Sequence, residues 1–231
     1  MHFVATQGLD AGAIFAIWHD PTVYDHMQMG PPYLPDAKTA RTASGKTALQ
    51  DSELGTVLEG LIGTYNGLPM SELAALLSVL RSANLIHQSH HWRTRGGSFY
   101  GDHLMFERLY NDSLPFIDQV AERAVGSGSH LLVRPEVQAN QISTLTALFC
   151  GEGPESTSDG YVRISLATEI RLLALLDLVY GRLEGAGNLS SGTDNLLQGL
   201  ADKHEEFVYL LRQRAQSKLS YDRRKDWTAP R

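Results

Sequence analysis

Three histidines and a glutamate surround a short glycine break in the stretch HHWRTRGGSFYGDHLMFE, residues 90–107. His91 precedes the Gly96-Gly97 pair, His103 follows it, and Glu107 comes four residues after His103. Mixed imidazole and carboxylate ligands suit a borderline divalent metal such as iron, because calcium and magnesium prefer oxygen ligands. The stretch therefore predicts a metal site near a turn between two helices.

Two further carboxylates, Asp118 and Glu122, share a face with His103 and Glu107 on the helix expected after the glycine pair. At about 100° per residue, Glu107, Asp118 and Glu122 lie roughly 40°, 60° and 100° around the axis from His103. Along the axis, His103 and Asp118 are about 22 Å apart at 1.5 Å per residue, too far for one ion. An antiparallel two-fold copy of the helix would bring the histidine end of one subunit to the Asp/Glu end of the other. The pattern therefore predicts two identical sites per dimer.

A purely structural explanation competes with this metal site. Carboxylates four residues apart are often only a solvated helix face, and a histidine on an apolar stripe is usually a core residue. His87, one turn before His91, is expected to make hydrogen bonds in the core or behind the site. Histidines gather at one end and carboxylates at the other, which favours chemistry. The Glu-x-x-His motif of di-iron bundles is absent, which favours a site between subunits over one inside each bundle.

Four amphipathic stretches with helical periodicity must position these residues. The first begins at about residue 71, with Ser71 as the expected N-cap, and ends at the glycine pair. The others cover about residues 98–125, 161–185 and 191–217, and the last carries an inward stripe of Leu196, Leu200, His204, Phe207 and Leu211. We therefore expect an all-α four-helix bundle. The connection at residues 126–160 is too long for a hairpin turn, so it can cross the bundle, leave the second and third helices parallel, and hold a short helix near 136–149.

The chain is expected to divide into three parts. Residues 1–70 form an N-terminal extension, partly irregular, with a short helix at 52–65, and residues 71–217 form the bundle. Residues 218–231 form a basic C-terminal tail, and the last 21 residues (211–231) carry seven basic and two acidic side chains. The remainder of the chain is acidic, which suits the handling of cations.

Composition narrows the class of protein. A hydrophobic content of 42% and a charged content of 20% predict an ordinary globular core. The single cysteine, Cys150, excludes an internal disulfide framework and fits a reducing compartment. No secretory signal or membrane span is recognised, so we expect a cytoplasmic protein without a membrane partner.

The stretch HHWRTRGGSFYGDHLMFERLYNDSLPFIDQVAER, residues 90–123, resembles the signature of the Dps family of mini-ferritins. The matching positions are His91-Trp92, Gly96, Phe99, His103, Glu107, Asp118 and Glu122, in register without a gap. The resemblance resumes at TDNLLQGLADKHEEFVYLLR (193–212) and covers roughly residues 71–215. Two features depart from the family pattern: about 70 residues precede the bundle, and the connection at 126–160 is loose.

This resemblance implies a ferritin-like bundle with a long crossover, assembled from two-fold dimers into a hollow dodecamer for iron storage under oxidative stress. It implies ferroxidase sites shared across the dimer interface, where Fe(II) is oxidised by hydrogen peroxide or oxygen and the ferric product mineralises in the cavity. His91, His103 and Glu107 would come from one subunit, and Asp118 and Glu122 from its partner. Trp92 would take part in electron transfer, although packing at the helix break explains it equally well.

Two other functions stay open at this stage. The chain could be a DNA-binding or structural shell protein in which the metal site is secondary, with DNA bound through the basic C-terminal tail. It could also be a cargo or scaffold protein recruited through residues 1–50, which contain five aromatic side chains: Phe3, Phe15, Trp18, Tyr24 and Tyr33.

Overall fold

The structure is a computed structural model that describes residues 47–150 and 157–225, with side-chain burial for residues 53–150 and 157–215. In these ranges every regular element is a helix, which confirms the all-α class. The elements are α4 (Thr47–Gly63), α5 (Ser71–Arg93), α6 (Phe99–Ser127), the 3-10 helix η1 (His130–Val133), α7 (Pro135–Cys150), α8 (Ser158–Gly185) and α9 (Ser191–Lys225). The aromatic residues expected to recruit a partner lie outside the described residues.

The chain divides into two compact units, Met1–Gly60 and Leu61–Arg231. α4 overlaps the short helix expected at 52–65, beginning five residues earlier and ending two residues earlier. The assignment of residues 1–70 to an extension of the bundle stays a prediction. Among the described residues, no helix is both long and apolar enough to cross a membrane.

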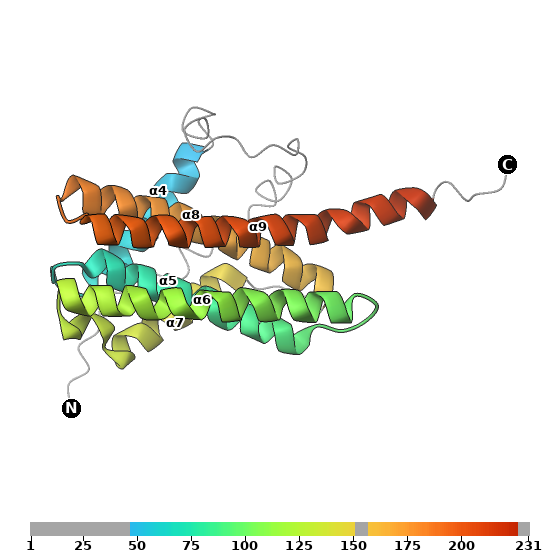
Figure 1. The fold of residues 1–231 in the computed structure, drawn as a ribbon, viewed down its shortest axis with the longest axis horizontal. Helices are drawn as coiled ribbons and strands as arrows, with labels where there is room; N and C mark the ends of the chain where they lie inside the picture. Colours follow the sequence, from blue (N-terminus) through green and yellow to red (C-terminus); the bar gives the residue numbers. More distant parts are fainter. Residues whose placement is uncertain (1–46, 151–156, 226–231) are drawn as a thin grey trace. The chain divides into compact units, whose positions relative to one another are not determined.

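The second unit contains four long helices arranged as two hairpins. α5 and α6 form one hairpin around residues 94–98, and α8 and α9 form the other around residues 186–190. α5 also packs against α8, and α6 against α9, so the two hairpins close into a bundle. Figure 1 shows the green helices α5 and α6 and the orange-red helices α8 and α9 as these two pairs. The predicted four-helix bundle is confirmed.

The prediction that Ser71 is the N-cap of α5 is wrong. Met70, not Ser71, precedes the helix, and its backbone lies in the left-handed region at φ 63°. The amide of Leu73 donates to the carbonyl of Met70 over 3.1 Å, so the helical hydrogen bonds already include Met70. Ser71 is a buried first-turn residue instead, and no side chain caps the helix.

The crossover between α6 and α8 contains the predicted short helix, α7. At its far end, Ser158 bonds to the turn that joins α5 and α6: Arg95 N donates to Ser158 Oγ over 3.2 Å, and Ser158 Oγ donates to Arg95 O over 3.0 Å. α8 therefore starts at the same end of the bundle as α6. Since the two helices start together and pass through one bundle, they run parallel, as the length of the connection predicted.

A cluster of apolar side chains joins three helices near that same end. It consists of Phe106 and Leu109 of α6, Tyr161 and Val162 of α8, and Phe207 and Leu211 of α9, none more than 1% exposed. The burial of six such side chains contributes about 1.5–3 kcal/mol each, which stabilises this end of the bundle. The turn that carries the candidate ligands lies directly next to this apolar cluster.

Candidate metal centre at the turn between α5 and α6

His91 and His103 meet face to face across the turn. Their ring centroids are 3.7 Å apart with an interplanar angle of 23°. His91 Nδ1 lies 2.9 Å from the carbonyl oxygen of His103, and His103 Nδ1 lies 3.0 Å from the carbonyl oxygen of His91. Each imidazole is therefore held by the backbone of the other residue.

These two hydrogen bonds determine which nitrogen carries the proton. A backbone carbonyl can only accept, so Nδ1 of each ring must be the donor. In the neutral ring, Nε2 then keeps its lone pair, and among the described residues neither Nε2 has a hydrogen-bond partner. An N–H tied to a backbone carbonyl, with the opposite nitrogen free, is the usual arrangement of a metal-binding histidine.

Aromatic rings fix the outer faces of this histidine pair. Phe99 stacks on His103 with a centroid distance of 4.9 Å, and Tyr110 meets His91 edge-on at 5.4 Å. His91 is 9% exposed, whereas Trp92 beside it is 66% exposed. The two imidazoles are thus packed against aromatic rings, and the exposed Trp92 follows the buried His91 directly in the chain.

The three candidate carboxylates are not gathered around the histidines. Glu107 is half-buried, while Asp118 and Glu122 are exposed farther along α6. Within the described ranges, no group of three or more His, Cys, Asp or Glu side chains is arranged to hold a metal ion. A single subunit therefore brings together two of the five proposed ligands, His91 and His103.

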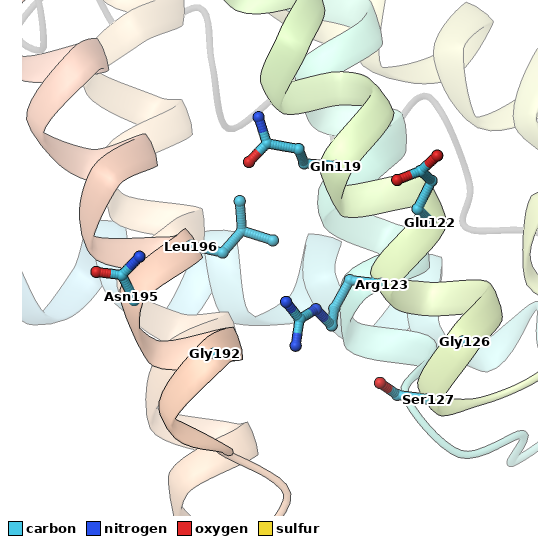
Figure 2. A pocket seen from close by; sticks show the side chains of 8 residues that line it. All are labelled: Gln119, Glu122, Arg123, Gly126, Ser127, Gly192, Asn195 and Leu196. Atoms are coloured by element: carbon cyan, nitrogen blue, oxygen red, sulfur yellow. The ribbon is translucent and has the colours of Figure 1, made fainter.

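Asp118 and Glu122 border two different hollows. Asp118 lines a cavity of about 380 Å³ together with Leu77, Arg81, Leu114, Ile117, Ala121, Val133 and Gln138. Glu122 lines another, of about 450 Å³, between the end of α6 and the start of α9. In Figure 2, Arg123 reaches from α6 toward Gly192 of α9, while Glu122 stays beside α6. Both carboxylates are open to solvent, and each is free to meet a group from outside the subunit.

A second polar cluster, which the sequence patterns did not predict, lies inside the bundle. Glu169 of α8 is fully buried between His87 of α5 and His204 of α9. His87 Nε2 lies 2.6 Å from Glu169 Oε1, and His204 Nδ1 lies 2.6 Å from Glu169 Oε2. Ser165 Oγ continues the chain, at 3.1 Å from His87 Nδ1 and 2.8 Å from His90 Nδ1. The expectation that His87 makes hydrogen bonds in the core is confirmed.

The protonation of this cluster follows from its contacts. Burial raises the pKa of Glu169, but His204 and then His87 outweigh burial and lower the pKa to about 2, so the group is a carboxylate. Both histidines must then donate to it. Burial, then the charges of His87 and Arg93, lowers the pKa of His90 to about 3, so His90 is neutral. His204 Nε2 is the one ring nitrogen here that is buried without a partner among the described residues.

A signal for this cluster was present in the sequence. Glu169 falls four residues after Ser165 and three before Leu172, a spacing that places it on the inner stripe of its helix. His204 stood on the predicted inner stripe of the fourth helix. A glutamate on an inner stripe requires a buried partner, and that requirement would have paired the two residues.

Comparisons with known proteins find similarity in sequence and in fold. The chain is 27% identical over 122 residues to the DNA protection during starvation protein 2 of Bacillus anthracis, covering 53% of this chain and 79% of that protein. No family model matches the chain.

Solved structures give the same fold. The X-ray structure of Dps from Thermosynechococcus elongatus aligns with a TM-score of 0.52 and 19% identity, covering 69% of this chain and 92% of that one. A mutant of Mycobacterium smegmatis Dps1 aligns with a TM-score of 0.48 and 17% identity, covering 75% of this chain and 99% of that one. The chain is thus similar in sequence to a Dps protein and has the ferritin-like helical fold of a solved Dps structure.

Proposed function

We propose that this protein is a mini-ferritin that oxidises Fe(II), with hydrogen peroxide as the oxidant, at sites shared between subunits. The ferric product would be stored as mineral in a hollow shell, a dodecamer by the family resemblance. The observation that carries the proposal is the reciprocal pair of Nδ1 bonds between His91 and His103. This pairing leaves the Nε2 lone pair of each stacked ring unused, so that both remain for an Fe(II) ion.

The ligands are divided between two subunits in this proposal. His91, His103 and Glu107 come from one subunit, and Asp118 and Glu122 from its partner. The division is supported by the helix length, since His103 and Asp118 are about 22 Å apart on α6 at 1.5 Å per residue. It is also supported by the lack of any three-ligand group within the described part of one chain.

An apolar surface on α5 and α6 favours such a dimer. Of the nine large apolar side chains that are exposed in the described residues, seven lie on these two helices: Leu85, Trp92, Phe99, Tyr100, Leu104, Leu114 and Val125. An exposed surface of this kind indicates an interface between proteins. The cavity beside Asp118 offers room for a partner's aromatic side chain, and Trp92 and Tyr100 at the histidine end are the most exposed candidates.

The proposed chemistry consumes two Fe(II) ions for each peroxide. Two Fe(II), one hydrogen peroxide and two protons yield two Fe(III) and two water molecules, so the two electrons needed to cleave the O–O bond come from iron. The imidazoles favour the borderline Fe(II) ion, and the carboxylates stabilise the higher charge of the Fe(III) product. Trp92, the exposed neighbour of His91, would carry an electron when only one iron is bound, as the family resemblance implies.

A mixed assembly tests the shared site. His103→Ala and Asp118→Ala should each abolish rapid Fe(II) oxidation, followed by absorbance after peroxide addition. Subunits of the two variants, mixed and reassembled, should recover part of the rate, because a heterodimer keeps one complete site while both losses fall in the other. The control mixes His103→Ala with His91→Ala, in which both sites of a heterodimer lack a histidine and no rate returns. No recovery in the first mixture, despite proven exchange of subunits, would rule out the shared geometry.

A second candidate function is DNA binding through the C-terminal tail, and the name of the Bacillus anthracis relative favours it. Residues 211–231 carry seven basic and two acidic side chains, and α9 continues as a helix to Lys225. The repeated tails of a shell would add avidity to weak contacts. In this alternative the shell protects DNA and its metal site is secondary.

A gel shift tests the tail. Phosphate contacts should dominate, so binding must weaken steeply between low and near-physiological salt. The full chain is compared with one truncated after Gln216, and the truncation should abolish the shift. Equal binding by both chains would exclude the tail, and no shift even at low salt would exclude DNA as a partner.

A further inference from the structure

An arginine near the end of α9 holds the first turn of α6. Arg214 Nε donates to Asp102 Oδ1 over 2.5 Å, and Arg214 Nη2 lies 2.9 Å from Asp102 Oδ2. Nη2 also lies 3.1 Å from Ser98 Oγ and 3.0 Å from Oδ1 of Asp159, the second residue of α8. One guanidinium thus joins the starts of two helices to the far end of a third.

This junction takes the place of a helix cap. Ser98 is the N-cap residue of α6, but its side chain makes no cap hydrogen bond; its hydroxyl instead donates to Asp102 Oδ2 over 2.7 Å. Asp102 is 1% exposed and the Arg214 side chain is 18% exposed, so water competes little for the pair. A bidentate arginine–carboxylate pair fixes direction as well as distance. The position of the first turn of α6 therefore depends on Arg214.

The residue after Asp102 is His103. Asp102 is bonded toward α9, while Nδ1 of His103 is bonded to the carbonyl of His91 at the end of α5. Consecutive residues of α6 are thus anchored to two different helices. Without the anchor on Asp102, the uncapped first turn is left to the histidine pair for its tie to α5.

We propose that Arg214 is a positioning residue for the iron site, holding the first turn of α6 so that the ring of His103 stays stacked on the ring of His91. This inference rests on the proposed function, since it concerns the affinity of the same two imidazoles for a metal ion. Arg214 touches no ligand itself and acts only through Asp102.

The conservative substitution Arg214→Lys separates geometry from charge. A lysine keeps the positive charge near Asp102 but cannot bridge both oxygens of its carboxylate together with Ser98 and Asp159. The matched control is Lys203→Ala, which removes another contact between α9 and α6, the ion pair of Lys203 with Asp112 at 3.6 Å, away from the histidines. Both variants weaken the contact between α6 and α9, but only Arg214→Lys does so next to the histidine pair.

The experiment measures metal affinity and oxidation rate separately in the assembled full chain. Co(II), which does not oxidise under these conditions, is titrated by absorbance, and Fe(II) oxidation is followed over a range of iron concentrations. Arg214→Lys should bind Co(II) about 10-fold more weakly, the usual cost of disturbing a group that orients a ligand. Its rate at saturating iron should equal that of the unaltered protein, because a bound ion draws the two imidazoles together. Lys203→Ala should match the unaltered protein in both measurements.

A double-mutant cycle identifies the route of the effect. If Arg214 acts through Asp102, the loss in Co(II) affinity for Arg214→Lys combined with Asp102→Asn should be no larger than the greater of the two single losses. Additive losses would overturn the proposal, and so would equal affinities for Arg214→Lys and Lys203→Ala. If the unaltered protein neither binds Co(II) nor oxidises Fe(II), the proposed function itself fails, which is a different result from an intact site that ignores Arg214.

Discussion

The protein has two histidine clusters one helical turn apart, and they use the imidazole ring in opposite ways. In the pair at the α5–α6 turn, His91 and His103 each point Nδ1 at a backbone carbonyl and leave Nε2 free. In the core, His87 uses both ring nitrogens, for Glu169 and for Ser165. The same side chain is thus a prepared metal ligand at one position and an internal hydrogen-bonding group four residues earlier.

The difference shows what decides the role of a histidine in this fold. A carbonyl partner is neutral and accepts a single hydrogen bond from each ring, so the opposite nitrogen stays available. A carboxylate partner is charged and fully buried, so it demands donors from both sides and holds the rings that supply them. We therefore expect the core cluster to control stability and the surface pair to control chemistry. Substitutions should therefore change stability most in the core cluster and least in the pair at the α5–α6 turn.

Removing the carboxylate from the core should have the largest effect on stability. Glu169→Ala leaves two buried N–H groups without an acceptor, so the free energy of unfolding should fall by about 3–5 kcal/mol. Replacing His87, Glu169 and His204 together by leucine should recover most of that loss, because no polar group is then left unpaired. Denaturant unfolding at fixed protein concentration measures both variants. A triple variant as unstable as Glu169→Ala would show that the cluster stabilises the fold by more than pairing its own polar groups.

The core should also make stability depend on pH. The pKa of His90 is lowered to about 3 in the folded protein, from 6.5 without burial. The unfolded chain therefore takes up a proton below about pH 6.5 that the folded chain refuses, and stability must fall as pH falls through that range. Between pH 7 and pH 5 the loss from this one group is about 2 kcal/mol.

His90→Asn should remove this share of the pH dependence, since an amide can still donate to Ser165 and does not titrate. Unfolding of the chelator-treated protein at pH 7, 6 and 5 measures it. His130→Asn is the control, because His130 is exposed and its substitution should leave the slope unchanged. Parallel slopes for all three proteins would contradict a neutral His90.

Substitution in the surface pair should change stability least and activity most. His103→Ala removes one part-buried hydrogen bond, and the His91 carbonyl still accepts from the Thr94 hydroxyl, so the free energy of unfolding should fall by about 1 kcal/mol. The same variant should lose rapid Fe(II) oxidation, because a fixed Nε2 ligand disappears. A loss of stability as large as that of Glu169→Ala would erase the distinction between the two clusters.

The spacing of apolar residues in the sequence predicted the helices better than it predicted the contacts of their polar side chains. Periodicity located all four long helices of the bundle and the short helix of the crossover, because a 3.6-residue stripe is imposed by the core itself. It placed Ser71 wrongly, because the left-handed turn at Met70 is a backbone feature that composition does not reveal. The fourth helix was expected to end at about residue 217, whereas α9 continues to Lys225.

For the site, the sequence indicated which residues belong together and missed how they are held. His91 and His103 were paired by their positions around the glycine break, and the structure brings them into contact. The exchange of hydrogen bonds between them was not predictable, because it depends on the angle at which two helices meet. Arg214 was missed for a related reason: it is 112 residues from Asp102 along the chain, and no local pattern connects them. The joint role of Glu107, Asp118 and Glu122 stays a prediction.

α6 is one unbroken helix from Phe99 to Ser127, and it carries four of the five proposed ligands, His91 of α5 being the exception. In a two-fold dimer, the length of this helix and the rotation between its two ends determine whether its acidic end faces the partner's histidines. Inserting one residue between Glu107 and Asp118 would lengthen it by only 1.5 Å but would turn the acidic end by about 100° away from the partner's histidines. Inserting seven residues would lengthen it by about 10 Å and turn that end by only about 20°. The phase of this helix, more than its length, therefore limits which insertions and deletions the protein can accept here.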